Sequence, residues 1–471
     1  MVKGLVFAAG IGFSVAVLTG CFSLPQRCDG GGQCTRDSEG QPTSCDVTSG
    51  YCRRVAPDAG PSDAGPAADA GASDAGLDSG MEMADAGPPV CRDYALPRAG
   101  LAIAPYQVSH SGTALTGFLL MGGLGPPGCT NAGTSVTFFE TSPTVGYRRE
   151  VSASLVYPVS DAAGAGPLGA APFVALFGGN SGMGDQGAIQ SYPAPAGSTL
   201  TNEFTVLSDP TPLDGGLFGL QGAQAVVLPA LAWPQDAGTA LFLLVGGNNT
   251  TTVAGVPLKE TYSFPLSASI TGGTFQCSSS SSSCNVSGLP ALQHFGMTVT
   301  PGGTVYVLGG YTGMNQGGTS DVYALLPPGD GGMPTWQGTG AGLGTARAFL
   351  TAVSDLQGRI YAIGGATNTA EYTPILANSI ERWDPDAGGQ KFTPLGALPR
   401  GGRSSAAAVY DPVSDSIYVF MGYVASGTGG GTDTRVDNGY DIYSVEAGTW
   451  RTCLADGGCV SCPSDGTCPS F

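Results

Sequence analysis

Positive charge is scarce in this sequence. Only 18 of its 471 residues are Lys or Arg, against 36 Asp or Glu, and the formal net charge is −18. Lysine occurs three times, at Lys3, Lys259 and Lys391. Because so acidic a chain repels the phosphates of DNA and RNA, we expect no nucleic-acid binding.

Long helical patterns are also lacking. No long amphipathic helix can be drawn after residue 21, and charged residues make up only 11% of the chain. Glycine (77) and proline (35) are abundant instead, which is typical of folds with many short strands and turns. Hydrophobic residues reach 42%, so a sizeable core is available and we expect an all-β fold.

Residues 1–20 resemble a bacterial lipoprotein signal peptide. Lys3 gives the start a positive charge, and the apolar run Leu5–Leu18 is too short to span a membrane. The run ends in Leu-Thr-Gly-Cys at Cys21, which resembles a lipobox, so Cys21 is the expected lipidation site and mature N-terminus. The next residue is Phe22 and not Asp, and this implies the outer membrane, facing either the periplasm or the exterior. The alternative is an ordinary secretory signal.

Residues 57–89 are expected to be a disordered linker. Asp-Ala-Gly recurs there between prolines, with no aromatic and no basic residue. Such a segment cannot bury enough apolar surface to offset the entropy of ordering. It separates a Cys-rich module, residues 21–56, from the rest of the chain.

An apolar run that ends in a glycine pair recurs six times, at intervals of 55 to 68 residues. The clearest copy is Thr304-Val-Tyr-Val-Leu-Gly-Gly-Tyr311. Each run predicts a buried strand, followed by a turn with positive φ. Self-similarity at this period indicates a repeat architecture. The pair begins at Gly122, Gly178, Gly246, Gly309, Gly364 and, with Met in place of the first Gly, Met421.

The fifth repeat shows the expected unit most clearly. Its four short runs, residues 347–353, 359–365, 378–384 and 391–395, predict a four-stranded antiparallel sheet. One such sheet cannot bury both faces alone, whereas six sheets packed in a closed ring can. We therefore expect a six-bladed β-propeller; the alternatives are a seven-bladed ring with one hidden blade and a propeller of another family.

Residues 90–452 resemble kelch-repeat propellers. The resemblance lies in the glycine pairs, in a fourth-strand aromatic such as Trp336 or Trp450, and in an arginine on the first strand at Arg98, Arg347 and Arg403. Repeats two to four lack that arginine. The resemblance implies that the loops after the glycine pairs gather around one mouth of the ring.

The cysteines are expected to form disulfides, because twelve remain beside Cys21 in an exported chain. We expect local pairs: two in the N-terminal module, Cys277 with Cys284, and two in a C-terminal tail, residues 453–471. The kelch resemblance implies Cys91 with Cys129, and the alternative is a ring-closing bridge from Cys91 to Cys453. Zinc is the other alternative for the two four-cysteine groups, which are Cys28, Cys34, Cys45 and Cys52, and Cys453, Cys459, Cys462 and Cys468.

The sequence offers few candidates for catalytic or metal-binding residues. Some kelch-like propellers resemble copper-radical sugar oxidases, which need a Tyr-His pair, but neither His110 nor His294 follows a tyrosine. We interpret both as ordinary structural residues. The acidic run Asp433–Asp441 departs from the EF-hand order, so a polar turn is favoured over a Ca²⁺ site. No catalytic residue, cofactor or metal is expected, and the chain is not expected to be an enzyme.

The favoured function is a surface-displayed module that binds a protein or glycan, whose identity the sequence does not reveal. The alternatives are an extracellular carbohydrate-active enzyme and a structural envelope protein without a discrete ligand. The loops after the glycine pairs carry few charges and several tyrosines, a composition suited to hydrogen bonding and stacking. The candidate binding residues are Arg98, Arg347, Arg403, Tyr311, Tyr372 and Tyr423.

Overall fold

The computed structural model describes residues 43–46, 51–54 and 98–462, the last range with gaps at 111–112, 126–132, 143–146, 151–153, 168–172, 181–188, 193–204, 209–219, 234–239, 249–256, 260, 267–285, 314–316, 329–333, 368–374, 426–433, 438 and 455–458. These residues form strands and turns, and none of them is helical, so the all-β prediction is confirmed for this part of the chain. No helix in the described part is long and apolar enough to cross a membrane. The chain divides into two compact units, residues 1–83 and 84–471.

The described residues of the first unit form one antiparallel hairpin. Its strands are β1 (Thr43–Asp46) and β2 (Tyr51–Arg54), and their register places the backbones of Cys45 and Cys52 opposite each other. Cys21, Cys28 and Cys34 lie outside the described residues, as does the predicted linker.

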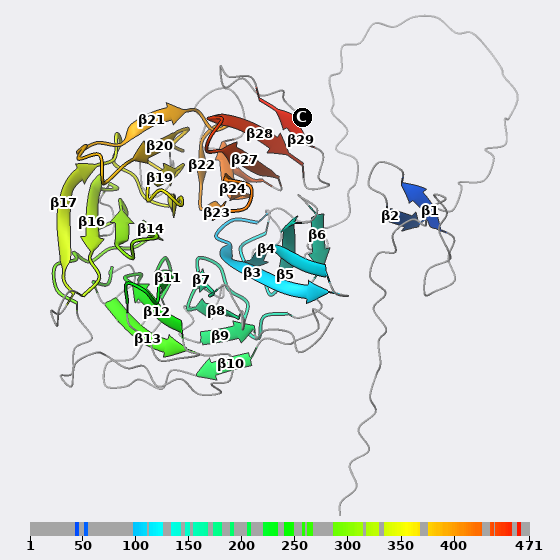
Figure 1. The fold of residues 1–471 in the computed structure, drawn as a ribbon, viewed down its shortest axis with the longest axis horizontal. Coiled ribbons are helices and arrows are strands. Elements are labelled where there is room, and N and C mark those ends of the chain that lie inside the picture. Colours follow the sequence, from blue (N-terminus) through cyan, green and yellow to red (C-terminus); the bar gives the residue numbers. More distant parts are fainter. Residues whose placement is uncertain are drawn as a thin grey trace, which may run out of the picture. The chain divides into compact units, whose positions relative to one another are not determined.

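The second unit consists of small antiparallel sheets, which Figure 1 shows arranged around a common centre. Seven of the sheets described have three to five strands, six main sheets and one accessory sheet, and within each the strands follow one another in sequence order. Sheets one to three comprise β3 (Ala102–His110), β4 (Thr113–Met121), β5 (Val136–Ser142) and β6 (Tyr147–Glu150); β7 (Ala163–Ala165), β8 (Val174–Phe177), β9 (Ile189–Tyr192) and β10 (Thr205–Ser208); and β11 (Gln224–Leu228), β12 (Ala240–Val245) and β13 (Thr261–Leu266).

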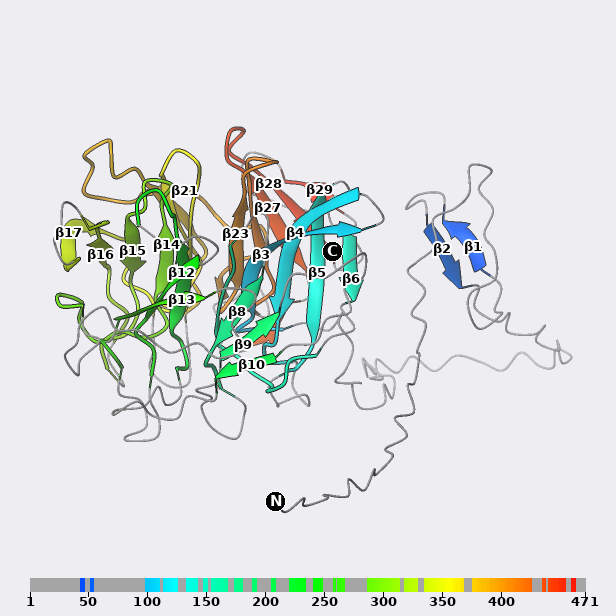
Figure 2. The same cartoon turned by 60° about the horizontal axis from the view of Figure 1, so that its bottom comes forward.

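Sheets four to six follow in the same way. They comprise β14 (Gly296–Val299), β15 (Val305–Leu308), β16 (Asp321–Leu325) and β17 (Trp336–Gly342); β18 (Thr351–Ser354), β19 (Ile360–Ile363), β20 (Ile380–Trp383) and β21 (Thr393–Gly396); and β23 (Ala407–Asp411), β24 (Ser416–Phe420), β27 (Tyr440–Ser444), β28 (Thr449–Cys453) and β29 (Cys459–Ser461). A small accessory sheet joins β22 (Arg403–Ser404), β25 (Tyr423–Ala425) and β26 (Thr434–Val436). Figure 2 shows the strands of sheet one side by side along their length.

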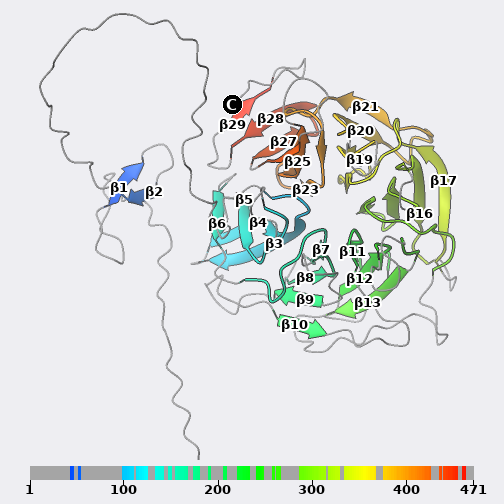
Figure 3. The same ribbon diagram turned by 180° about the vertical axis from the view of Figure 1, so that it is seen from behind.

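The first strands of the six sheets form the inner wall of the second unit. In order, β3, β7, β11, β14, β18 and β23 each lie beside the next, and β23 lies beside β3. Figure 3 shows the same succession of sheets from behind. The arrangement is that of a β-propeller-like fold, in which the last repeat returns to the first.

Each pair of neighbouring sheets encloses its own apolar cluster. Sheets one and two share a cluster that includes Tyr106 and Tyr192, and the equivalent clusters continue around the unit. The cluster between sheets six and one is rich in aromatic rings, with Phe139 in edge contact with Phe420 and Tyr440 at 4.8 Å each. Face-to-face packing of successive sheets therefore supplies the core that no single sheet could make.

The glycine pairs connect each repeat to the next. At Gly309 and Gly310 φ is 62° and 95°, so the predicted positive-φ turn is confirmed. A Cβ at Gly309 would lie 2.5 Å from the Arg347 carbonyl oxygen, and the Gly310 amide donates to that oxygen at 3.0 Å. The Gly422 amide makes the corresponding bond to Arg98 and joins the sixth repeat to the first. A side chain at Gly309 would collide with the Arg347 backbone, whereas in the sixth repeat Met421 occupies the equivalent position with a φ of 49°.

The C-terminal cysteines extend sheet six. A disulfide joins Cys453 in β28 to Cys459 in β29, which confirms one of the local pairs expected in the tail. The alternative bridge from Cys91 to Cys453 is therefore wrong, and so is a zinc site that uses Cys453 and Cys459. Because β28 runs through Cys453 without a break, the expected boundary at residue 452 falls inside a strand. The remaining predicted pairs rest on Cys91, Cys129, Cys277, Cys284 and Cys468, which lie outside the described residues.

Candidate functional site

Six backbone hydrogen bonds form a closed circle at the centre of the second unit. One residue from each repeat donates its N–H to the carbonyl of the residue from the preceding repeat, at distances of 2.7 to 3.0 Å. We call this circle the axial belt. Because the first residue donates to the last, the belt links all six repeats through main chain alone. Its members are Gly100, Asp161, Gly222, His294, Phe349 and Ser405.

All six belt residues have a left-handed backbone. Their φ angles lie between 49° and 70°, although only two of them are glycines. For Asp161, His294, Phe349 and Ser405 this conformation costs on the order of 1–3 kcal/mol each. Such residues persist where the surroundings fix them, and they gather at functional sites. The belt is therefore a candidate functional site.

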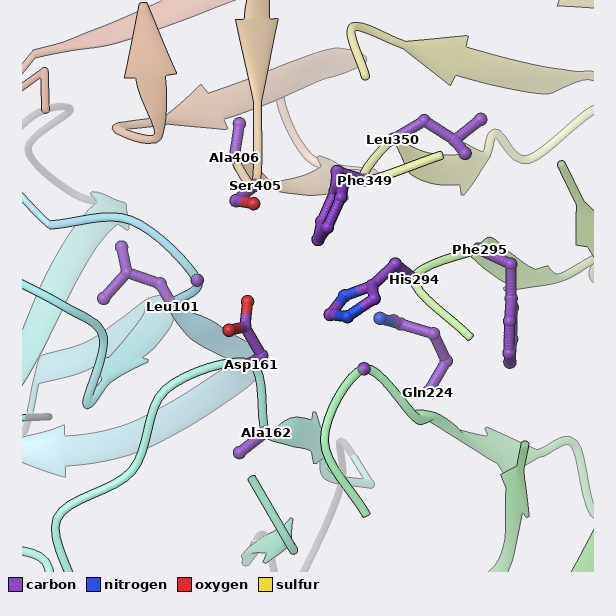
Figure 4. A pocket seen from close by; sticks show the side chains of 12 residues that line it. Leu101, Asp161, Ala162, Gln224, His294, Phe295, Phe349, Leu350, Ser405 and Ala406 are labelled. Atoms are coloured by element: carbon purple, nitrogen blue, oxygen red, sulfur yellow. The ribbon is translucent and has the colours of Figure 1, made fainter. Parts of the chain in front are cut away.

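The belt residues line a cavity of about 60 Å³, together with a residue one or two positions after each of them in the chain. We call it the axial cavity. Figure 4 shows the side chains of Asp161, His294 and Phe349 pointing into it. The belt glycines leave room for two of these side chains. A Cβ at Gly222 would lie 2.7 Å from the His294 ring, and one at Gly100 would lie 2.5 Å from Asp161 Oδ1.

One side of the cavity is aromatic. The His294 and Phe349 rings lie against each other, with centroids 4.1 Å apart and an interplanar angle of 37°. The Tyr311 ring meets both edge-on, 5.3 Å from Phe349 and 6.1 Å from His294. Two backbone hydrogen bonds to Gln293 hold Tyr311 beside the belt. The structure thus brings one predicted binding residue, Tyr311, together with two residues that were not predicted.

The other side of the cavity is acidic. Gln221 Nε2 donates to Asp161 Oδ2 at 3.4 Å, and Asn180 Nδ2 donates to Gln221 Oε1 at 3.3 Å. Burial raises the pKa of Tyr423, and the nearby negative charge of Asp161 raises it further. Tyr423 therefore stays protonated at neutral pH, close to the Asp161 carboxylate. It is the second predicted binding residue that lies near this cavity.

The three predicted arginines are enclosed by the protein. Arg98, at 3% exposure, donates to the carbonyl oxygens of Gly122 and Ser135. The other two are at most 1% exposed. Arg347 pairs with Glu381 at 2.9 Å, and Arg403 pairs with Asp441 at 2.8 Å. These contacts fasten the segment that leads into a sheet to later residues of the same repeat, so we assign the arginines a structural role.

The remaining sequence candidates do not reach the cavity. Tyr372 lies outside the described residues. In the acidic run once considered for Ca²⁺, Asp437 and Asp441 pair with Arg400 and Arg403, so their charges are already neutralised. No group of three or more metal-ligating side chains occurs in the described part of the chain.

Sequence reasoning missed Asp161, His294, Phe349 and Ser405. The sequence does mark them by a fixed spacing, because each belt residue stands two positions after the arginine or the residue that replaces it. Arg347-Ala-Phe349 and Arg403-Ser-Ser405 show this spacing. The spacing alone did not reveal that the six positions meet on one axis.

Comparison with known proteins adds little beyond the fold. No protein-family model matches the sequence, and no curated protein does. Among solved structures, 173 chains match. YjhT has a TM-score of 0.49 and 13% identity over 78% of this chain and 98% of its own. A fungal alcohol oxidase of the AA5 family, in complex with copper, has a TM-score of 0.40 and 14% identity over 71% of this chain and 60% of its own. At these values no residue role is transferred from either protein.

Proposed function

We propose that this chain is a lipid-anchored binding protein of the bacterial outer membrane. In this proposal a six-bladed, kelch-like propeller holds a protein or glycan on the face around the axial cavity. The proposal rests on one observation. Residues from several repeats, each with a strained backbone and a partly exposed side chain, line that one cavity. Residues with a strained backbone gather at functional sites, and a cavity lined by several repeats is a usual place for a ligand.

The loops after the glycine pairs extend this surface. The residue after each described pair bridges to the residue just before the belt, as Tyr311 does with Gln293 and Asn248 with Gln221. The loops therefore start at the rim of the cavity. Loops on a rigid scaffold commonly carry binding residues, because they vary without disturbing the core.

The cavity is too small to hold a whole macromolecular ligand. About 60 Å³ corresponds to roughly four to six waters, at about 10–15 Å³ of such volume per water. One chemical group of the ligand would enter the cavity, while the rest would lie on the loops. This favours recognition of an extended partner over enclosure of a free small molecule.

An enzymatic role is the second candidate, favoured by the presence of His294 and Asp161 in one cavity. Glycoside hydrolysis in most families needs two carboxyl groups that flank the scissile bond. Asp161 is the one carboxylate among the described residues that line the cavity. We therefore prefer binding without chemistry.

The binding role is tested with the full chain carrying Cys21→Ser, which should be free of lipid. It is screened on glycan and peptide arrays, and any ligand found is titrated against two variants. Tyr311→Ala should weaken binding at least tenfold, whereas deletion of residues 22–89 should leave it unchanged. If the deletion abolishes binding and Tyr311→Ala keeps it, the propeller is not the binding module. If no ligand is found, the result favours the alternative of a structural envelope protein without a discrete ligand.

The anchor is tested by the same substitution in cells. Cys21 ends an apolar run in the sequence Leu-Thr-Gly-Cys, the place where lipoprotein processing acts. Cys21→Ser should release the protein from the membrane fraction. Fractionation that finds Cys21→Ser still membrane-bound, with an unchanged mature N-terminus, would contradict the lipid anchor.

A further inference from the structure

We infer that the axial cavity takes a positively charged group, the primary ammonium at the end of an unbranched alkyl chain, as presented by a lysine side chain of a protein partner. This inference rests on the proposed binding role and specifies the chemistry of its ligand.

Asp161 differs from three buried carboxylates of the described residues that pair with arginine. Glu381, Asp355 and Asp441 each face an arginine, at 2.9, 2.6 and 2.8 Å respectively. Asp161 instead receives a long hydrogen bond from a neutral amide, 3.4 Å from Gln221 Nε2. No lysine or arginine is among the described residues that line the cavity. The carboxylate is therefore half-enclosed without a cationic partner in the described structure.

An ammonium would complete this site. It has three N–H donors and no acceptor, so it needs several oxygen or nitrogen acceptors at once. Asp161 offers a charged acceptor, and Ser405 and Gln224 add a hydroxyl and an amide oxygen from other repeats. Figure 4 shows these three side chains around the same space. Hydrogen bonds with both partners charged are the strong ones.

The aromatic side of the cavity suits the same ligand. The Phe349 ring lines the cavity, and the Tyr311 ring packs edge-on against the Phe349 ring. A cation over an aromatic face gains about 0.5–2 kcal/mol, the larger value when water is excluded. The alkyl part of a lysine side chain also gains from apolar contact with Leu101 and Leu350, which line the cavity as well.

Size and long-range charge agree with this assignment. A cavity of about 60 Å³ admits a narrow alkylammonium end. The net charge of −18 attracts basic partners from a distance, an effect that weakens as salt is added. Anionic ligands would be repelled both by the overall negative charge and by the Asp161 carboxylate.

The test is a titration of the full chain carrying Cys21→Ser with n-butylammonium, followed by NMR or calorimetry. Uncharged n-butanol and anionic butyrate serve as matched probes. We expect saturable binding of n-butylammonium, weaker by tenfold or more for n-butanol and undetectable for butyrate. Asp161→Asn should weaken n-butylammonium binding at least tenfold. Asparagine tolerates the left-handed backbone, so this variant should fold, and near-UV circular dichroism checks that it does.

Asp321→Asn is the control, because Asp321 is exposed and does not line the cavity. It should bind n-butylammonium as the parent does. Equal binding of the three probes, or unchanged binding by Asp161→Asn, would overturn the inference. A lysine peptide and glucosamine are compared last, and a preference for glucosamine would overturn the assignment to a lysine side chain.

The outcomes separate this inference from the proposed function. Suppose that a ligand from the arrays loses affinity with Tyr311→Ala but not with Asp161→Asn. That result would support the binding face and refute the assignment of an ammonium group to the cavity. A ligand whose affinity neither variant changes would refute the proposed binding face as well.

Discussion

Closure of the ring should depend on Phe139. This side chain is fully buried between sheets six and one and contacts Phe420 and Tyr440 edge-on, with centroids at 4.8 Å. Deletion of a buried phenyl ring costs about 3–5 kcal/mol, since the surroundings collapse only in part. Phe139→Ala should therefore lower the free energy of unfolding by about that amount, measured by urea denaturation.

The effect should be local as well as global. In the described residues the first and last repeats share no strand, so they meet through side chains and through backbone bonds from the Gly100 and Gly422 amides. Hydrogen exchange of these two amides should accelerate in Phe139→Ala. Phe242→Ala is the matched control, because Phe242 is equally buried between sheets two and three. It should instead expose the Gly222 amide, which donates to Asp161 there.

Two results would refute this reasoning. A loss of less than 1 kcal/mol in Phe139→Ala would mean that the aromatic cluster does not close the ring. Equal protection of Gly100 and Gly422 in the two variants would mean that the closure interface does not open separately from the rest.

Two further predictions concern buried charge and pH. Arg347→Ala should lower the free energy of unfolding by about 3–5 kcal/mol, because it leaves Glu381 buried without its partner, and the double variant Arg347→Met, Glu381→Leu should recover most of that loss in the same urea assay. Burial, and then a hydrogen bond to Asp415, raises the pKa of Tyr410 to about 12. Because unfolded tyrosine ionises near pH 10, the stability from this group is present below pH 10 and is lost as the pH rises from 10 to 12; Tyr410→Phe should lack that part of the pH dependence of unfolding.

The repeat architecture could be predicted because its constraints are local. A strand that ends at Gly309-Gly310 shows its apolar run and its positive-φ turn within a few residues. The same logic found Trp336, which is buried at 3% and donates to Thr261 of the preceding sheet at 3.0 Å. Local patterns therefore gave the sheets and their order.

The site could not be predicted because it depends on closure. Nothing near Phe349 or His294 in the sequence demands a left-handed backbone, which arises when six repeats meet on one axis. The interpretation of His294 as an ordinary structural residue therefore overlooked its place in the cavity. The role of Arg347 was equally hidden, since its partner Glu381 stands 34 positions later in the chain. A buried ion pair between residues so far apart in the sequence can be recognised only once the fold brings them together.

The central claim is that a ligand binds at the axial cavity, and blocking that cavity tests it most directly. In the Cys21→Ser chain, Ser405→Cys places one thiol at the belt, and a bulky methanethiosulfonate reagent then fills the cavity mouth. The control is Asp321→Cys, labelled in the same way on an exposed strand position. With a ligand from the array screen, the account predicts that labelling at position 405 abolishes binding while labelling at 321 does not. Full binding by the chain labelled at 405 would contradict it.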